Sequence, residues 1–383
     1  MKRRAIVTIA TQSYTHFALA LADSVREHEA DAEFFVCFAD STPPEIAQHV
    51  HPENQFEAQD LGIPNWQRMA FQYTPFELSC ALKPFVMQHL VQLGYEEIIY
   101  LDADMRLLGP LAEVTSAFQS DSIVLTPHLI RPLPEDGKIP GEDLFLVAGT
   151  FNAGFVGIRN DQHARAFLEW WSNRLKSECY KDLAGSIFVD QKWLSLVPGL
   201  FENVHILRHP GYNTGHWTLS QFSLSGDHEH GFAVDGKPLA LFHFSNLCPG
   251  KCEAFHRSQN RMKLHELPAL QELVSTFHTA LQIYDQDGVF SKLACRFNSL
   301  SDGTPIHPSW REAVRRNHPS VEAVSDPFDV SAHPNLKTVF DSLQGQSHKW
   351  RKDWRLKPPN IAQQKLKKKL KSWMKTVGLR KAA

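Results

Sequence analysis

The segment that most constrains the fold is a short apolar run that ends in two aspartates. Residues 97–101 read Glu-Ile-Ile-Tyr-Leu and follow a break at Gly94, so they predict a short buried strand. Asp102 and Asp104 stand where this strand should end. In an open α/β sheet, ligands bind beyond the carboxyl ends of the strands. Both carboxylates therefore fall where a ligand would lie.

The spacing of the two aspartates predicts a metal site. Alternation along a strand would point both side chains to the same side, about 7 Å apart at the backbone. Like charges held that close repel each other, and a bridging divalent cation relieves the repulsion. Mg²⁺ or Mn²⁺ held by one or two carboxylates commonly binds phosphate oxygens. In a chain with 42 acidic residues a solvated turn is the alternative, so it is the preceding strand that favours a metal–diphosphate site.

The rest of the N-terminal half predicts an α/β layer. Residues 5–10 and 33–38 predict strands, with a polar turn at 11–14 and a helix between them. This opening is typical of nucleotide-binding layers, although a generic α/β start without a ligand fits it too. Further strands are predicted at 122–126, 150–158 and 239–245, a helix at 162–178, and a loop or lid at 127–147.

Two polar residues in predicted helices have two interpretations each. Thr74 and Glu77 have the spacing of a capping box, and the helix they start carries Lys83 and then Pro84, which is expected to kink it. Lys83 would either reach a phosphate or be a solvated surface lysine. Asp190 precedes a predicted helix, where it would serve chemistry or simply act as the N-cap.

His243 is predicted near the end of an apolar strand. A lone histidine there is either a hydrogen-bonded core residue or, beside two carboxylates, a ligand for Mn²⁺. His243 also begins a series with Cys248, Cys252 and His256. The spacing of this series does not match the usual two-plus-two pattern, so a structural zinc is the weaker alternative.

The charge is distributed unevenly along the chain. The net charge is −2, yet residues 1–350 hold 41 of the 42 acidic residues and 28 of the 40 basic ones. Residues 351–383 carry the other twelve basic residues, and within them Leu366, Leu370, Trp373 and Val377 repeat at helical spacing. This basic amphipathic pattern favours an anionic membrane surface; a disordered tail is the alternative. We expect no nucleic-acid partner, because the acidic body would repel phosphates.

Compartment and domain organisation follow from the same sequence. The apolar run after Met1-Lys-Arg-Arg is too short for a secretion signal, no run approaches the length of a membrane span, and the scattered cysteines suit buried thiols. These features predict a cytoplasmic protein at the inner face of the membrane. We expect a catalytic domain over 1–261, a mostly helical region over 262–350 and a basic tail over 351–383.

Six segments, taken together and in order, resemble a known family. They are Val7–Tyr14, Leu82-Lys83-Pro84 ahead of Ile99–Asp104, Phe151–Phe155, Val189–Gln191, Gly211–Asn213 and Phe242–Ser245. The chain is similar over roughly residues 5–261 to metal-dependent glycosyltransferases of the GT-A fold. It most resembles the glycogenin-like and lipopolysaccharide galactosyltransferase-like group, family 8, and its relatives from bacterial polysaccharide clusters. The resemblance implies a mixed central sheet flanked by helices, here with a helical C-terminal extension.

The resemblance also implies roles for individual residues. Asp102, Asp104 and His243 would hold Mn²⁺, or Mg²⁺, which grips the diphosphate of a UDP-sugar, and Asp190 and Gln191 would lie at the anomeric carbon of a retaining enzyme. The donor would further contact a set of residues along the chain: Thr8, Ala10, Thr11, Tyr14, Lys83, Asp102, Ala103, Asn152, Gly154 and Lys251. Asn152 and Gly154 would also meet the acceptor, a polysaccharide or lipid-linked glycan. The chain departs from the family pattern near the end of the resembling region, where Asn246 replaces a glycine and Lys251 lies two positions late.

Other classes remain open on the residues alone. A nucleotidyltransferase has a similar α/β layer, and an inactive sugar-nucleotide or glycan-binding module would keep the same fold. An aspartyl phosphatase also places Asp-x-Asp after a strand, but it needs a small hydroxyl residue where Arg106 stands here.

Overall fold

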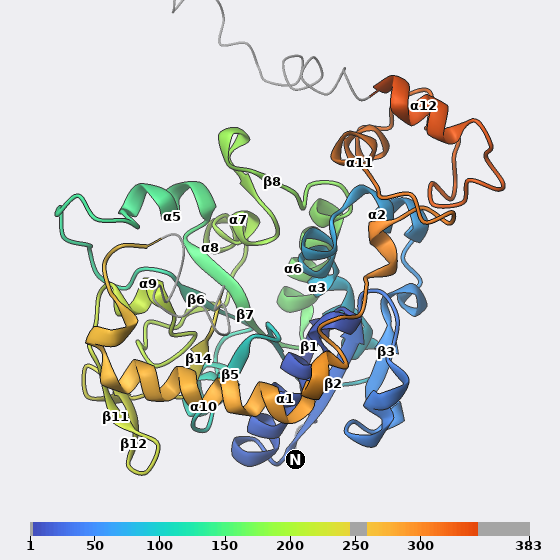
Figure 1. Cartoon of the computed structure of the whole chain (residues 1–383). Coiled ribbons are helices and arrows are strands. Elements are labelled where there is room, and N and C mark those ends of the chain that lie inside the picture. Colours follow the sequence, from blue (N-terminus) through green and yellow to red (C-terminus); the bar gives the residue numbers. More distant parts are fainter. Residues whose placement is uncertain (1–2, 246–258, 344–383) are drawn as a thin grey trace, which may run out of the picture.

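The computed structural model describes residues 3–245 and 259–343, and a seven-stranded sheet with helices on both faces forms its centre (Figure 1). The strand order is β10-β6-β7-β4-β1-β2-β3. Strand β7 runs antiparallel to its neighbours β4 and β6, and every other pairing is parallel. The predicted mixed α/β layer is thereby confirmed. Its strands are β1 (Arg4–Ala10), β2 (Ala32–Phe38), β3 (Gln55–Glu57), β4 (Glu97–Leu101), β6 (Ile123–Pro127), β7 (Phe151–Arg159) and β10 (Val204–Ile206).

The central strands are apolar throughout because both faces of the sheet are covered. In β1, Ala5, Val7 and Ile9 pack toward α3 (Pro75–Gln92) and α6 (Gln162–Leu175). The alternate residues Ile6 and Ala10 pack toward α1 (Thr15–His28) and α4 (Ala112–Ala117). The period of two along a strand thus divides the core into two layers.

Helix α3 begins at the predicted capping box. The Thr74 hydroxyl accepts a hydrogen bond from the backbone N–H of Glu77 at 3.3 Å, and the Glu77 carboxylate accepts one from the backbone N–H of Thr74 at 2.9 Å. The helix runs on from Pro75 to Gln92 with Pro84 inside it. Lys83 therefore lies on the face of the sheet that α3 covers.

Several smaller elements differ from the predictions. The end of the predicted loop 127–147 is helical, as α5 (Glu142–Ala148), and α2 (Trp66–Gln72) is a helix that was not predicted. The predicted strand 239–245 is reduced to β14 (Leu241–His243), which pairs antiparallel with β5 (Met105–Leu107) and not with the main sheet. The remaining short elements are β8 (Lys181–Asp182), β9 (Ile187–Phe188), α7 (Gln191–Leu194), α8 (Val197–Leu200), α9 (His216–Leu219), β11 (Leu224–Asp227), β12 (Gly231–Val234) and β13 (Lys237–Pro238).

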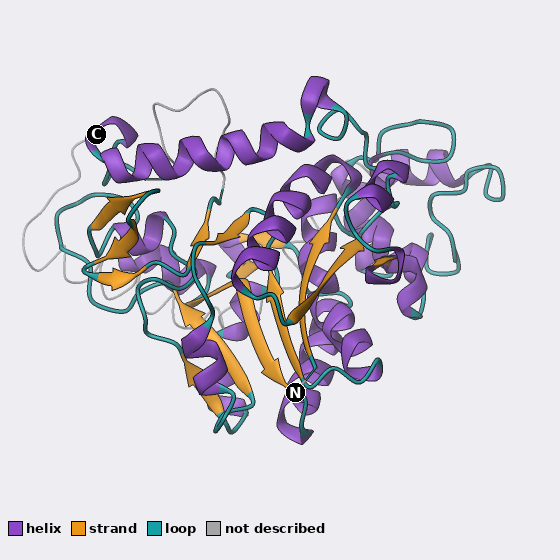
Figure 2. Cartoon of the chain, turned by 90° about the horizontal axis from the view of Figure 1, so that it is seen from below, coloured by secondary structure: helices purple, strands orange, loops and turns teal. Residues whose placement is uncertain are grey.

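Within residues 259–343, three α-helices form the predicted helical extension: α10 (Pro268–Tyr284), α11 (Pro308–Arg315) and α12 (Leu336–Leu343). Helix α10 packs on α1, where the rings of Phe17 and Phe277 lie 6.0 Å apart, and Figure 2 shows it as the long helix crossing above the sheet. Helix α11 packs on α2. The buried guanidinium of Arg311 donates hydrogen bonds to the carbonyls of Phe71, Tyr73 and Phe297.

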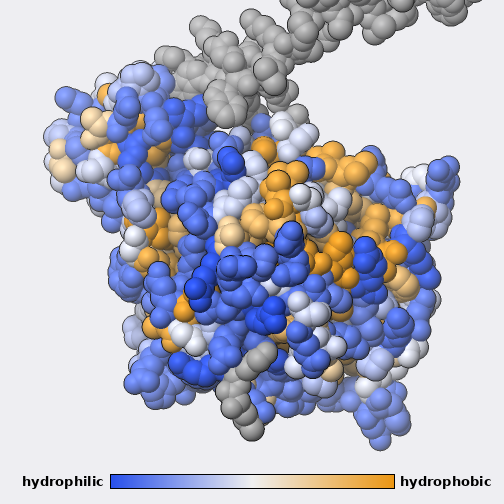
Figure 3. Space-filling view, turned by 180° about the vertical axis from the view of Figure 1, so that it is seen from behind, coloured by the Kyte–Doolittle hydropathy of each residue, from blue (hydrophilic) through white to orange (hydrophobic). Residues whose placement is uncertain are grey.

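The outer surface is largely hydrophilic. Figure 3 shows the face opposite that of Figure 1, on which apolar residues gather in the upper part. Over 3–245 and 259–343, the helices are too short or too polar to cross a bilayer. Four cysteines in these ranges, Cys37, Cys80, Cys179 and Cys295, are buried free thiols, as predicted for a reduced protein.

Candidate active site

The two aspartates lie in a tight turn between β4 and β5. The N–H of Met105 donates to the carbonyl of Asp102 at 3.1 Å, and the N–H of Asp102 donates to the carbonyl of Gly154 in β7 at 2.8 Å. The expected strand alternation across Asp102–Asp104 is therefore wrong, because β4 ends at Leu101. The turn itself, pinned to β7, directs both carboxylates to one place.

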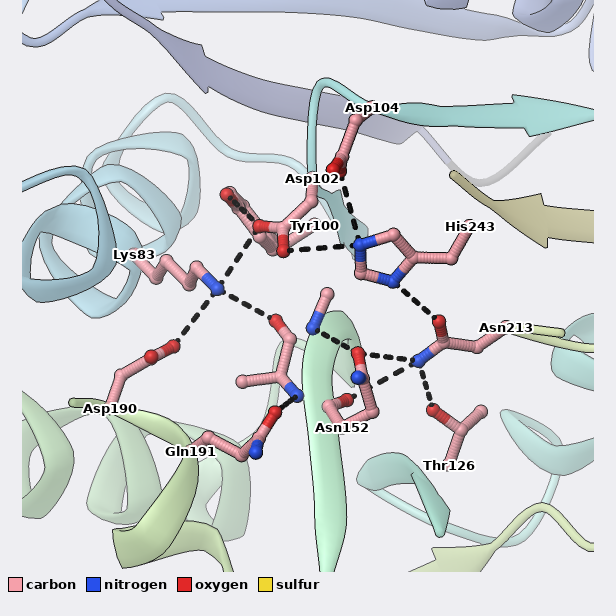
Figure 4. Close-up of polar contacts among 12 residues, drawn as sticks. Lys83, Tyr100, Asp102, Asp104, Thr126, Asn152, Asp190, Gln191, Asn213 and His243 are labelled. Carbon is pink, nitrogen blue, oxygen red and sulfur yellow. Dashed lines mark hydrogen bonds and ion pairs between the residues drawn. The ribbon is translucent and has the colours of Figure 1, made fainter. Parts of the chain in front are cut away.

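His243 completes this group from β14 (Figure 4). Its Nε2 atom lies 3.1 Å from Oδ1 of Asp104 and 3.9 Å from Oδ2 of Asp102. One ligand atom of each of the three residues lies within 4.8 Å of the other two. Burial alone would lower the pKa of His243, but the carboxylates of Asp104 and Asp102 raise it overall. The two carboxylates thus favour positive charge beside the imidazole, which agrees with its predicted role as a metal ligand.

Glycine is required at position 154 by the approach of this imidazole. A Cβ atom there would lie 2.5 Å from Cε1 of His243 and 2.8 Å from Oδ1 of Asn152. Both neighbours are buried, so neither could move aside without cost. The structure places Gly154 beneath the candidate metal ligand, whereas the resemblance implied a contact with sugar and acceptor.

Lys83 is buried and fully paired. Its ammonium group lies 3.1 Å from Oδ1 of Asp102 and 2.9 Å from Oδ2 of Asp190, and it donates to the carbonyl of Ala153 at 2.9 Å. Burial alone would lower the pKa of Lys83, yet the two carboxylates raise it well above its ordinary value. The alternative of a solvated surface lysine is wrong, because only 3% of the side chain is exposed. An ammonium group has three donors, and these contacts use all of them.

Asp190 and Gln191 enter the site from the start of α7. Asp190 occupies the N-cap position of α7, but among the described residues its carboxylate makes no capping hydrogen bond and faces Lys83 instead. The Gln191 amide accepts from the N–H of Ala153 at 3.3 Å and donates to the carbonyl of Ala148 at 3.0 Å. Val189, directly before them, has a φ of 41°, which is strained for a β-branched residue. Such strain is common beside functional groups.

A chain of buried amides and imidazoles extends the site beyond His243. Nδ1 of His243 lies 3.0 Å from Oδ1 of Asn213, whose Nδ2 lies 3.0 Å from Oδ1 of Asn152. Nδ2 of Asn152 lies 3.1 Å from Nε2 of His128. Burial lowers the pKa of His128 to about 3, so its ring is neutral. Neither His128 nor a role for Asn213 was predicted, because their hydrogen-bond partners lie far away along the chain.

The predicted nucleotide-side residues lie at and after the end of β1. Thr8, Ala10 and Thr11 are buried, whereas Tyr14 is 51% exposed and stacks on Phe17 at 5.0 Å. The hydroxyl of Thr8 has no hydrogen-bond partner within 3–245 and 259–343.

Asp40 is a further polar residue at this sheet edge, just after the end of β2. Its Oδ1 accepts from the N–H of Gln12 at 2.9 Å, while its buried Oδ2 has no hydrogen-bond partner among the described residues. Burial raises the pKa of this carboxyl. Its position at the end of β2, next to β1, could have indicated it.

Some predicted residues lie outside the described ranges. They are Lys251, the departure at Asn246, and the three further members of the alternative zinc series, Cys248, Cys252 and His256. The basic tail 351–383 also lies outside them.

The arrangement suits a divalent cation. Among the described residues, the three carboxylates of Asp102, Asp104 and Asp190 and the ammonium group of Lys83 leave two formal negative charges in one cluster. Carboxylate oxygens and a neutral imidazole nitrogen are ligands that Mn²⁺ accepts, and three protein ligands leave coordination positions for a substrate. The donor set therefore fits the predicted metal.

Comparisons with known proteins add two sequence relatives and several weak structural similarities. No protein-family model matches the chain. YfnF of Bacillus subtilis (strain 168) is 25% identical over 245 residues, which span 63% of this chain and 80% of YfnF. YfnD of the same organism is 24% identical over 244 residues, spanning 62% of this chain and 76% of YfnD. Both relatives are described as uncharacterized.

Solved structures of glycosyltransferases are similar at low level. The galactosyltransferase LgtC, in complex with donor and acceptor sugar analogs, is 14% identical and aligns over 73% of this chain and 95% of its own, with a TM-score of 0.42. The glycosyltransferase GlyE of Streptococcus pneumoniae TIGR4 is 14% identical over 78% of this chain and 67% of its own, also with a TM-score of 0.42. TM-scores below 0.5 leave both similarities without weight for the activity of this chain.

Proposed function

We propose that the chain is a metal-dependent, retaining glycosyltransferase that moves a hexose from a UDP-sugar to a polysaccharide or lipid-linked glycan. The observation that carries the proposal is the meeting of Asp102, Asp104 and His243 at the carboxyl end of the central strand β4. Ligands of open α/β sheets bind at this edge. The ordered series of segments that resembles family 8 supports the same activity.

The chemistry of sugar transfer matches this cluster. Breaking the bond between the anomeric carbon and the diphosphate leaves negative charge on the leaving group, and a divalent cation held by Asp102, Asp104 and His243 would stabilise that charge. The ammonium group of Lys83 forms an ion pair with Oδ1 of Asp102 at 3.1 Å. With all three donors in use, Lys83 positions carboxylates, and a phosphate contact would require it to release one of them.

Asp190 and Gln191 are proposed to face the reacting sugar. Lys83 keeps Asp190 paired, and the amide of Gln191 is fixed at both ends by backbone groups. Both side chains are thus held in place before substrate binds, which favours stabilisation of an oxocarbenium-like state over the approach of a mobile nucleophile.

The proposal predicts joint binding of nucleotide and metal. A UDP-sugar with Mn²⁺ should raise the melting temperature more than either alone, since a ligand at 100 times its Kd stabilises a protein by about 2.7 kcal/mol. Thermal shifts across a panel of nucleotide sugars measure this, and product analysis should show slow release of UDP and free hexose. With pyrophosphate added, formation of UTP and a sugar 1-phosphate from the UDP-sugar would instead identify a nucleotidyltransferase. The absence of any shift would contradict the proposal.

We also propose that the protein acts at the cytoplasmic face of the membrane through its basic tail. Each basic residue near an anionic surface contributes about 1 kcal/mol. Deleting 359–383 should therefore release the protein from anionic vesicles in a sedimentation assay, while turnover of a soluble acceptor is unchanged. Neutral vesicles serve as the control, and undiminished sedimentation with anionic vesicles would contradict the role of the tail.

A further inference from the structure

The hydrogen-bond chain behind His243 has a fixed direction. The backbone N–H of Gly154 can only donate, so the Asn152 atom 2.9 Å from it is the amide oxygen. That oxygen also lies 3.0 Å from the Asn213 amide, which must therefore present its nitrogen. Two more acceptors of this nitrogen, the hydroxyl of Thr126 at 2.8 Å and the carbonyl of Asn152 at 3.4 Å, agree with the assignment.

This direction determines the tautomer of His243. Because the nitrogen of the Asn213 amide faces Asn152, its oxygen faces Nδ1 of His243 at 3.0 Å. An amide oxygen has no hydrogen to donate, so Nδ1 must carry one. In the neutral ring Nε2 then has a free lone pair, and Nε2 is the atom that faces Asp104 and Asp102. Histidine ligands of metals commonly have their other nitrogen held in this way.

The far end of the chain is fixed as well. Nδ1 of His128 lies 2.9 Å from the carbonyl of Gly149, so it donates, and its Nε2 accepts from the Asn152 amide nitrogen. The Trp217 ring lies edge-on to both imidazoles, 5.3 Å from His128 and 5.2 Å from His243, and its N–H donates to the carbonyl of Asn213 at 3.1 Å. Packing therefore prevents either imidazole from turning over.

We propose that His128, Asn152 and Asn213 are positioning residues that hold His243 in the Nδ1–H tautomer and so present Nε2 as a metal ligand. The inference rests on the proposed function, because it takes the Asp102–Asp104–His243 group to be the metal centre. It assigns Asn152 a structural partnership with His128 that is separate from any contact with sugar. Loss of such outer partners typically lowers metal affinity 10- to 100-fold.

Asn213→Gly is the direct test. Asn213 has a φ of 52°, a conformation that glycine adopts without strain, so the variant removes the amide and keeps the backbone. Titration of the protein with Mn²⁺ alone, followed by the loss of the free-ion EPR signal, should show a Kd about 10- to 100-fold higher than that of the wild type. Thr126→Val removes a partner of Asn213 that is not on the path to His243, so its Kd should stay within about threefold of the wild type.

The outcomes separate this inference from the proposed function. A wild type that binds Mn²⁺ beside an Asn213→Gly variant of equal affinity would overturn the inference alone. A wild type without affinity for Mn²⁺ would overturn the metal centre and the inference together. A variant that only melts earlier, with an unchanged Mn²⁺-induced shift, would show a merely structural role and also overturn it.

A second measurement needs no change to the chain except for assignment. Proton–nitrogen correlation spectra of ¹⁵N-histidine-labelled protein with Mg²⁺ report which ring nitrogen carries hydrogen. The His243 signals are identified by their absence from His243→Gln. We expect hydrogen on Nδ1 of His243, and hydrogen on Nε2 in the metal-loaded protein would overturn the proposal.

Discussion

Replacing Asp104 by alanine is expected to abolish Mn²⁺-dependent UDP-sugar turnover while the protein remains folded. The Asp104 carboxylate is paired with His243 in the candidate metal centre and 24% of its side chain is exposed, so its removal takes away a ligand without emptying the core. Loss of metal-based stabilisation of the leaving group is worth several kcal/mol, and about 4 kcal/mol corresponds to a rate lower by about a thousandfold. Donor hydrolysis and sugar transfer measure the effect.

The control for this prediction is Asp60→Ala, which removes an exposed carboxylate from the same half of the chain. We expect it to keep wild-type turnover. The free energy of unfolding of Asp60→Ala should stay within about 0.5 kcal/mol of the wild type, as surface substitutions usually do. Urea unfolding checks that Asp104→Ala is still folded. Retained turnover in the folded Asp104→Ala protein would show that the metal centre has been assigned to the wrong residues.

Replacing Lys83 by methionine should destabilise the protein more than any other single substitution in the site. Lys83 neutralises Asp190, whose side chain is 1% exposed, and Asp102, which is 29% exposed. Removing one partner of a buried ion pair leaves an uncompensated charge and typically costs about 3–5 kcal/mol. Urea unfolding should show this loss in the free energy of unfolding.

Two further variants separate the charge effect from the loss of a side chain. Lys176→Met makes the same substitution at an exposed lysine and should lower the free energy of unfolding by less than about 0.5 kcal/mol. The double variant Lys83→Met/Asp190→Leu removes both buried partners and should regain part of the stability. If Lys83→Met alone lowered the free energy of unfolding by less than about 1 kcal/mol, the buried ion pair would not be essential to the fold.

Local features of the fold were predictable because the sequence contains all the residues that form them within one short window. The capping box of α3 involves residues three positions apart. The strands β1 and β4 are largely apolar runs, and the residues that end each run are its neighbours in sequence. The metal-ligand candidates were also predictable, since Asp102 and Asp104 follow a strand directly. His243 entered through its place near the end of an apolar run.

Features that depend on distant partners were not predictable in this way. Lys83 resembles a surface lysine until Asp102 and Asp190 are brought to it by β4 and α7. The turn at Asp102–Asp104 follows from pairing with Gly154 in β7, which no local pattern signals. The proposed positioning role of His128 and Asn213 is visible only in the hydrogen-bond chain that connects them to His243. Such roles require the tertiary structure.

The hydrogen bonds of Arg311 have a consequence for the architecture as a whole. Its guanidinium satisfies carbonyls at the C-terminal end of α2, some 240 positions earlier in the chain, a task that helices usually leave to a neighbouring residue or to water. Burial lowers the pKa of Arg311 to about 10, so the group stays charged at neutral pH. Without the extension, the carbonyls of Phe71 and Tyr73 would lose these hydrogen bonds. The apolar side chain of Phe71, which packs against the extension, would also be exposed to water.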